Sequence, residues 1–225
     1  MAALADTIDR INGALKRVPV LPLYFVALIP GAWAFWQALS GAIGADPVRA
    51  LEHALGLYAL QFMIATLAVT PLRERLGVNF LRFRRMLGLT AFYYALAHLG
   101  AWMAFDRNFN WLAIVADLTR RPYIIVGMIA LLAMIPLAAT SFDRAIRALG
   151  AARWRNLHRL GYVAALAMAL HYLWLVKSWT GEPLTYAFIV IALVGYRLLP
   201  KKPKRRGGRS SDAFAKPVRQ STLRV

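Results

Sequence analysis

The chain has 225 residues, 60% of them hydrophobic, and a positive mean hydropathy, yet its formal net charge is +18 at pH 7. Only 17% of its residues are charged, against about a quarter in a typical soluble domain, so the composition predicts an integral membrane protein and argues against binding to nucleic acid. Because there is no cysteine, disulfides, thiolate-ligated or covalently attached haem and cysteine-ligated iron–sulfur clusters are excluded.

Six apolar runs along the chain are long enough to cross a bilayer, which takes about 20 mostly apolar residues. The predicted fold is therefore all-α, an integral membrane bundle of six transmembrane helices near residues 20–39, 53–72, 86–105, 122–140, 157–176 and 184–199. The last run is short, and its helix could begin as early as Pro183. We expect an N-terminal segment over residues 1–19, a transmembrane domain over 20–200 and a separate tail over 201–225.

The first apolar run follows Lys16 and Arg17, as the apolar part of a signal peptide would. Its length exceeds the usual apolar part of a signal peptide, which is about 7 to 15 residues. We therefore expect an uncleaved membrane helix.

Lysine and arginine divide unevenly between the two sets of connections, and the richer set is expected to be cytoplasmic. The poorer side holds Arg49, Arg107, Arg120, Arg121 and Lys177. The richer side holds Arg10, Lys16, Arg17, Arg73, Arg75, Arg82, Arg84, Arg85, Arg144, Arg147, Arg153 and Arg155, and nine more after Pro200. Both termini are therefore predicted to be cytoplasmic, which agrees with an even number of spans.

The tail over 201–225 is rich in proline, glycine, serine and basic residues, and it cannot bury enough apolar surface to fold alone. We expect a disordered anchor near anionic lipid, with a docking segment for a cytoplasmic partner as the alternative.

Two histidines lie deep inside predicted spans, where an ionisable side chain is costly and usually functional. His98 is about 12 residues into the third span and His171 about 14 residues into the fifth, which runs in the same direction, so both lie about 18 to 21 Å from the cytoplasmic end. Two histidines at one depth on parallel helices can hold a flat metal macrocycle between them. This pattern predicts a bis-histidine haem that transfers electrons.

The residues around these histidines leave two interpretations open. Small residues could make room for a porphyrin or could simply permit close helix packing. They are Gly88, Ala91, Ala95, Ala97 and Gly100 in the third span, and Gly161, Ala164, Ala165, Ala167 and Ala169 in the fifth. A proton relay is less expected, because such relays usually recruit carboxylates and none lies well inside any predicted span.

A third histidine, His158, opens the fifth span on the cytoplasmic side, about 20 Å below His171. It could ligate an inner haem or act as an interfacial hydrogen-bonding residue. At the matching position of the third span the sequence has Arg84 and Arg85, which are poor iron ligands but good partners for propionates or a phosphate. These two arginines are therefore candidate cofactor-binding residues.

Two features on the predicted external side of the membrane each have two interpretations. His53 opens the second span after an Asp-Pro turn, so it is either a surface residue or part of a site for quinol oxidation or partner docking. Arg120 and Arg121 precede Pro122 and are either an interfacial anchor or contacts for haem propionates.

From about Gly44 to Pro200 the chain resembles the haem-binding membrane subunits of bacterial protein-methionine-sulfoxide reductase systems, the MsrQ or YedZ family of ferric-reductase-like transmembrane domains. The resemblance rests on the order of the segments GADPVRALEH, TPLR, RRMLGL with His98 downstream, TRRPYIIVGM, LAATS, LGAARWRNLHRLGYVAALAMALHYLWLVK and PLTYAFIVIALVGYRLLP.

The resemblance implies b-type haem in a multi-pass protein of the bacterial inner membrane, with one haem or two. Electrons would come from quinol or a cytoplasmic flavin reductase and pass to a periplasmic molybdopterin-containing methionine sulfoxide reductase, where the catalysis takes place. His98 and His171 match the family's outer haem pair, and His158 its inner fifth-span histidine. The wider superfamily often has a second histidine on the third span where this chain has Arg84.

Family members are also described as binding FMN, although no glycine-rich phosphate loop occurs in this sequence. A stand-alone ferric or other metal reductase is the first alternative function. A non-redox membrane transporter or scaffold with structural histidines is the second.

Overall fold

The computed structural model describes residues 2–176 and 181–199, which form helices joined by short connections, with no strand among them. A 3₁₀ turn (Leu81–Phe83) precedes α4, and a π-helical turn (Trp102–Asp106) extends it. The predicted tail over 201–225 and Lys177 lie outside the described residues. The α-helices are α1 (Ala2–Arg17), α2 (Val20–Leu39), α3 (Pro47–Leu76), α4 (Arg84–Ala101), α5 (Trp111–Arg120), α6 (Pro122–Ala139), α7 (Asp143–Leu157), α8 (Leu160–Leu175) and α9 (Gly181–Leu198).

Each apolar run predicted from the sequence coincides with a helix, and the all-α prediction is confirmed. Of the helices described, α2, α3 and α6 are long and apolar enough to cross a membrane. Among the helices that match the predicted apolar runs, α4, α8 and α9 are too short or not apolar enough to meet this standard. Two arginines open α4, α8 begins only after the turn at His158 and has 16 residues, and α9 carries Glu182 and Arg197.

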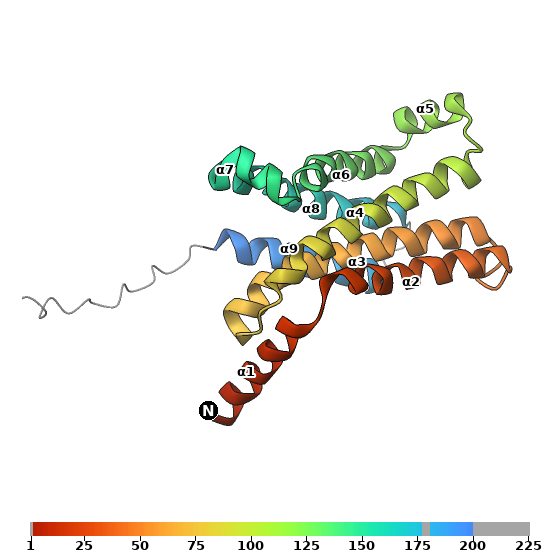
Figure 1. The fold of residues 1–225 in the computed structure, drawn as a ribbon. Coiled ribbons are helices and arrows are strands. Elements are labelled where there is room, and N and C mark those ends of the chain that lie inside the picture. The colour runs from red at the N-terminus through yellow and green to blue at the C-terminus, as the bar shows by residue number, and fades with distance from the viewer. Residues whose placement is uncertain (1, 177–180, 200–225) are drawn as a thin grey trace, which may run out of the picture.

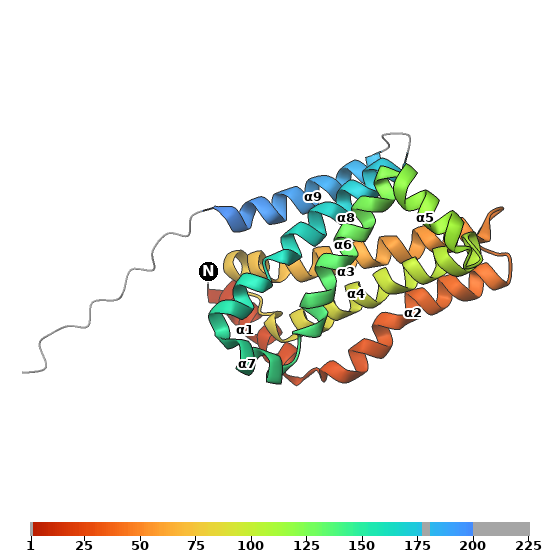
Figure 2. The ribbon, with the colours of Figure 1, turned by 90° about the horizontal axis from the view of Figure 1, so that it is seen from above.

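Helices α2, α3, α4, α6, α8 and α9 run side by side, with α6 inclined to the others (Figures 1 and 2). The most extensive contacts join α3 to α4 and α6 to α8. Small side chains allow this close approach, because Ala91 of α4 and Ala164 and Ala165 of α8 are fully buried in the largest apolar cluster. The bundle thus contains two tight helix pairs, α3 with α4 and α6 with α8, and the candidate site lies between these pairs.

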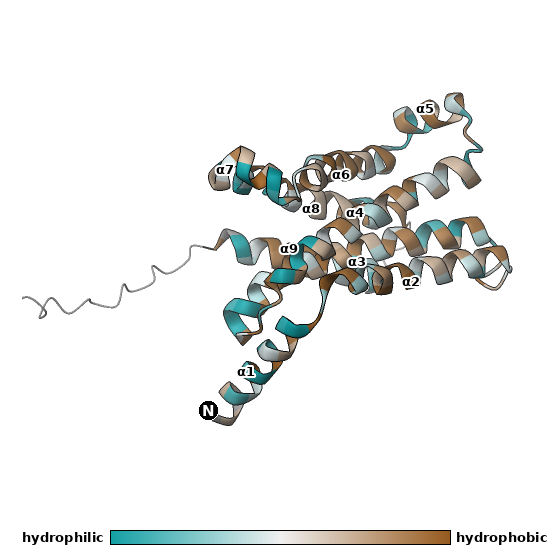
Figure 3. Ribbon diagram, in the orientation of Figure 1, coloured by the Kyte–Doolittle hydropathy of each residue, from teal (hydrophilic) through white to brown (hydrophobic). Residues whose placement is uncertain are grey.

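Three further helices, which were not predicted from the sequence, flank the ends of the bundle. At one end lie α1 and α7, and at the other lies α5 (Figure 1). Their polar residues stand out against the apolar middle of the bundle (Figure 3). These helices are amphipathic, so none of them has the continuous apolar run by which a membrane-spanning helix is predicted.

The arginine-rich connections gather at the end that holds α1 and α7. Arg82 donates to the backbone carbonyls of Leu15 and Lys16 at the end of α1, and Asn12 of α1 donates to the carbonyl of Gly77 at 3.0 Å. Arg85 forms an ion pair with Asp143, the first residue of α7. The N-terminal segment and two of the basic connections are therefore on the same side of the bundle.

Helix α2 is fastened to α4 by the hydroxyl of Tyr94. This hydroxyl donates to the carbonyl of Ala27 at 2.7 Å and accepts from the backbone N–H of Gly31 at 2.9 Å. A helix would ordinarily join these two groups directly, but Pro30 interrupts α2 between them. A Cβ atom at Gly31 would lie 2.7 Å from the Tyr94 ring, so glycine permits the close approach.

We expect Tyr94→Phe to lower the free energy of unfolding by about 1–3 kcal/mol, because it leaves a buried carbonyl and a partly buried N–H group of α2 without their shared partner. Thermal or denaturant unfolding of the purified protein in detergent measures this effect. Tyr93→Phe is the matched control, because its side chain is exposed and makes no hydrogen bond in the described part of the chain. Equal stability of the two variants would contradict the fastening role of Tyr94.

Candidate functional site

A cavity of about 660 Å³ lies between the two helix pairs. Its walls come mainly from α3, α4, α6 and α8, and both His98 and His171 line it. Apolar residues form most of the remaining wall, including Leu60, Leu131, Met134 and Met168. The cavity therefore combines an apolar interior with two imidazoles, as a cofactor site requires.

His98, from α4, is held by α3. Its Nδ1 atom lies 2.8 Å from the backbone carbonyl of Glu52. A carbonyl oxygen only accepts, so Nδ1 carries the ring proton and the lone pair on Nε2 is free. A backbone carbonyl at the far nitrogen is the usual support for a metal-ligating histidine.

His171, from α8, is held by α6 in the same way. Its Nδ1 atom donates to the carbonyl of Tyr123 at 2.6 Å, which again leaves Nε2 free. Each histidine is thus oriented by the opposite helix of its own tight pair, α3 for His98 and α6 for His171.

A glycine faces each imidazole, four residues after the carbonyl that accepts from it. A Cβ atom at Gly56 would lie 3.2 Å from Nδ1 of His98, and a Cβ atom at Gly127 would lie 2.9 Å from Nδ1 of His171. Any larger residue at Gly127 would therefore displace the ring or the helix. Because these two residues have no side chain, each imidazole can approach the helix closely enough to donate to its carbonyl.

The two imidazole rings are close enough to share one metal. Their ring centres are 6.1 Å apart. Two metal–nitrogen bonds of about 2 Å each, with the distance from each nitrogen to its ring centre, would place the centres about 6 Å apart. The rings are inclined at 75°, which is compatible because each ring can rotate about the nitrogen–metal axis. The donor set and spacing therefore fit a haem iron with two axial imidazoles.

Several of the small residues noted in the sequence serve helix packing. Ala164, Ala165 and Ala169 lie in the buried core cluster, whereas Ala95 lines the cavity. The helix-packing interpretation is therefore favoured for the fifth span. Room for a cofactor comes instead from the separation of the two helix pairs.

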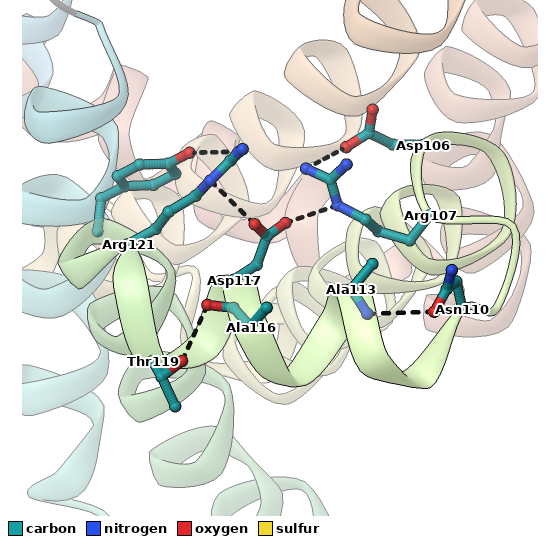
Figure 4. A network of polar contacts seen from close by, with 9 residues as sticks. Asp106, Arg107, Asn110, Ala113, Ala116, Asp117, Thr119 and Arg121 are labelled. Carbon is teal, nitrogen blue, oxygen red and sulfur yellow. Dashed lines mark hydrogen bonds and ion pairs between the residues drawn. The ribbon is translucent and has the colours of Figure 1, made fainter.

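Charged residues surround the mouth of the cavity at the end of the bundle that holds α5 (Figure 1). Asp117 of α5 forms ion pairs with Arg107 at 2.6 Å and with Arg121 at 3.0 Å, and Arg107 also pairs with Asp106 at 3.1 Å (Figure 4). Asp117 thus joins both ends of the connection between α4 and α6, since Arg107 follows α4 and Arg121 precedes α6. Arg121 is also hydrogen-bonded to Tyr123, whose carbonyl holds His171.

Replacement of Asp117 by asparagine should loosen the connection that contains α5. Two arginines would lose their shared carboxylate, at a cost of about 1–3 kcal/mol to the closed arrangement. We expect amide hydrogen exchange across residues 107–121 to accelerate by about tenfold or more. Asp143→Asn is the control, because its ion pair with Arg85 is exposed and lies at the other end of the bundle. Unchanged exchange in Asp117→Asn would contradict the bridging role.

His53 lies at this same mouth. Its side chain is exposed, and its Nε2 atom lies 3.2 Å from the hydroxyl of Tyr172, the residue after His171. Both residues line the cavity. Sequence analysis gave His53 no partner, because nothing in the sequence indicates which residue of a distant helix meets it.

His158 lies at the opposite end, away from the His98–His171 pair. Its Nε2 atom is 3.1 Å from the hydroxyl of Thr140, and its ring stacks on Trp154 with the centres 3.9 Å apart. Arg84 is an electrostatic neighbour of His158, as expected from their matching depths. Arg85 instead points to Asp143, and this hydrogen bond lowers the pKa of the Asp143 carboxyl below its usual range.

Sequence reasoning did not identify the residues that support the two imidazoles, namely Gly56, Gly127 and the carbonyls of Glu52 and Tyr123. Single glycines in apolar helices carry no signal, and a backbone carbonyl has no residue-type signature. The polar network around Asp117 was also missed, although Arg121 was a candidate on sequence grounds.

Comparison with known proteins points to one family. Residues 53–169 match the family described as ferric reductase like transmembrane component. A relative from Brucella anthropi, named protein-methionine-sulfoxide reductase heme-binding subunit MsrQ, is 50% identical over 206 residues, 92% of this chain and 93% of the relative. Proteins of the same name from Brucella ovis and Brucella melitensis are each 50% identical over 176 residues, 78% of this chain and 80% of the relative.

Proposed function

Because the chain belongs to the MsrQ family of ferric-reductase-like membrane proteins, we propose that it is the haem b subunit of a bacterial methionine sulfoxide reductase system. In this role it transfers electrons and leaves the reduction of the sulfoxide to a partner. The system would repair oxidised proteins outside the inner membrane.

The observation that carries this proposal is the pair of supported imidazoles, whose ring centres are 6.1 Å apart. His98 and His171 would be the two axial ligands of one haem, which supplies reversible one-electron transfer when bound. The carbonyls of Glu52 and Tyr123 fix both rings with Nε2 free. Fixed ligands favour electron transfer because little reorganisation is needed between the oxidised and reduced states.

We infer a six-span arrangement in the inner membrane, formed by α2, α3, α4, α6, α8 and α9, with both termini cytoplasmic. The gathering of α1, α7 and the basic connections at one end supports this orientation, because cytoplasmic loops hold the excess of lysine and arginine. The cavity mouth with Asp117 would then face the periplasm, where the partner would accept electrons.

The proposed partner is a periplasmic molybdopterin-containing methionine sulfoxide reductase, and the proposed donor is quinol or a cytoplasmic flavin reductase. An FMN bound near the inner end would connect a soluble reductase to the haem. These assignments rest on the family to which the chain belongs.

We propose one haem for the chain, with His158 as an interfacial residue. The contact of its Nε2 with the Thr140 hydroxyl and its stacking on Trp154 favour this role over iron ligation. Arg84 stands where a second ligand would be needed, and arginine is a poor ligand for iron.

Visible spectroscopy of the purified protein, expressed with ample haem, tests the proposal. We expect a Soret band and b-type bands that sharpen on reduction, with about one haem per chain. Absence of these bands would contradict electron transfer and favour a non-redox transporter or scaffold. Co-purification with a periplasmic molybdenum enzyme would distinguish the proposed function from a stand-alone metal reductase, which needs no such partner.

A further inference from the structure

Helix α5 has an apolar face that the rest of the described chain leaves uncovered. This face consists of Trp111, Leu112 and Val115, which are 65%, 85% and 57% exposed. Leu112 has the largest exposed fraction among the large apolar side chains that the structure describes. Successive residues of a helix are rotated by about 100°, so the three side chains lie within one arc of about 100°. A clustered apolar surface of this kind marks a contact with a membrane or with another protein.

The opposite side of α5 is held against the bundle. Asp117 lies roughly opposite the apolar face and forms ion pairs with Arg107 at 2.6 Å and with Arg121 at 3.0 Å (Figure 4). Ile114, which also lies off the apolar face, is buried. These contacts fix the rotation of α5 about its own axis. The apolar face therefore points away from the bundle.

The position of α5 indicates what this face meets. Helix α5 lies on the flank of the bundle, next to the start of α6, and the two helices are in contact (Figures 1 and 2). The connection between α2 and α3 extends further along the bundle axis than α5 does (Figures 1 and 2). Because α5 lies beside the bundle and not beyond its end, a side chain that points outward from it meets the edge of the bilayer.

The exposed apolar surface of α5 continues into that of α6. Only Arg121 separates the two helices, and α6 is long and apolar enough to cross a membrane. One side of α6 exposes Ile125, Ile129, Leu132 and Ile135, whose spacing places them on a common face. In a membrane-spanning helix such a face contacts acyl chains. This continuity favours lipid over a soluble protein as the partner of α5.

We propose that α5 is an interfacial helix whose apolar face lies in the bilayer, at the boundary between headgroups and acyl chains. Amphipathic helices with tryptophan and leucine on the apolar side bind membranes at this depth. The charged residues of α5 are Arg120 and Asp117, and Asp117 is paired on the inward side, so apolar contact and not headgroup charge decides the binding. Through the ion pairs of Asp117, lipid contact attaches the mouth of the His98–His171 cavity to the membrane surface. The proposal requires that α6 crosses the bilayer, and it does not depend on the haem.

Single cysteines test the proposal, because the chain has no cysteine of its own. Leu112→Cys and Val115→Cys are prepared in the full-length protein in phosphatidylcholine nanodiscs, which leave both membrane surfaces open to reagents. We expect both thiols to react with a charged thiol reagent about tenfold or more slowly than Ala45→Cys, because apolar surroundings disfavour the reactive thiolate. Ala45 is an exposed residue of the connection between α2 and α3. Arg120→Cys is the matched control on α5 itself, since Arg120 is exposed but lies off the apolar face, and it should react faster than Leu112→Cys.

A fluorescent label on the same cysteines identifies what covers them. Phosphatidylcholine with a nitroxide in its acyl chain quenches labels in lipid, whereas iodide quenches labels in water. We expect the nitroxide lipid to be the stronger quencher at Leu112→Cys and at Leu132→Cys of α6, and iodide to be the stronger quencher at Ala45→Cys.

Three results would overturn the proposal, and each has a different meaning. Rapid reaction and iodide quenching at Leu112→Cys, with Leu132→Cys in lipid, would leave the apolar face free for a soluble protein. Slow reaction at Leu112→Cys without quenching by either agent would mean that protein, such as a second copy of the chain, covers the face. Iodide quenching at Leu132→Cys would show that α6 does not cross the bilayer, which would also contradict the six-span arrangement.

Discussion

His98→Ala and His171→Ala are each expected to abolish the low-spin b-type spectrum of the protein. Both imidazoles would serve one iron, since their ring centres are 6.1 Å apart, so loss of either removes half of the axial ligation. We expect haem content to fall by about tenfold or more. Loss of a residue that only hydrogen-bonds to a metal ligand already lowers metal affinity by about 10- to 100-fold. The measurements are the haem-to-protein ratio and the reduced-minus-oxidised difference spectrum.

His53→Ala and His158→Ala are the matched controls, since both histidines lie outside the pair and are held by other partners. They should retain the haem-to-protein ratio of the wild type. Membrane insertion and monodispersity are checked for every variant, because an unfolded protein would also lack haem. Full haem content in either His98→Ala or His171→Ala would refute the ligand assignment.

Gly127→Ala should impair haem binding although alanine is apolar, small and a good helix former. The new Cβ atom would lie 2.9 Å from Nδ1 and 3.0 Å from Cε1 of His171, so the ring must move away from α6. That movement lengthens the hydrogen bond to the Tyr123 carbonyl, which is 2.6 Å in the native protein. We expect haem affinity to fall by about 10- to 100-fold, as when the supporting partner of a metal-bound histidine is lost.

Gly56→Ala should show the same effect more weakly, because its Cβ atom would lie 3.2 Å from Nδ1 of His98. Gly100→Ala is the matched control, since it lies on the same helix as His98 and its Cβ atom would meet nothing within 4 Å. Haem titration of the apoprotein ranks the three variants. If Gly127→Ala binds haem as tightly as Gly100→Ala, the glycine does not position the ring.

The helices of the bundle were predictable because each has a continuous apolar run, and α2 begins and ends where its run does. The equal depth of His98 and His171 was also predictable, since rise per residue converts sequence position to depth on parallel helices. The amphipathic helices α1, α5 and α7 could not be predicted in this way, because they lie at the ends of the bundle and have no continuous apolar run.

The backbone carbonyls that orient His98 and His171 could not be predicted, because they belong to neighbouring helices. The partner of His98 is a carbonyl 46 residues earlier, and that of His171 is a carbonyl 48 residues earlier. A sequence gives depth but not the rotation of a helix about its axis, which decides the side chains that meet. The two hydrogen bonds between the Tyr94 hydroxyl and α2 could not be predicted for the same reason.

The electron paramagnetic resonance spectrum of the oxidised protein tests whether His98 and His171 ligate one haem iron, because it reports the axial ligands of that iron. We expect a low-spin ferric signal of a bis-imidazole haem that is absent from both His98→Ala and His171→Ala. A high-spin, five-coordinate signal in the wild type, or a low-spin signal that survives either substitution, would contradict it.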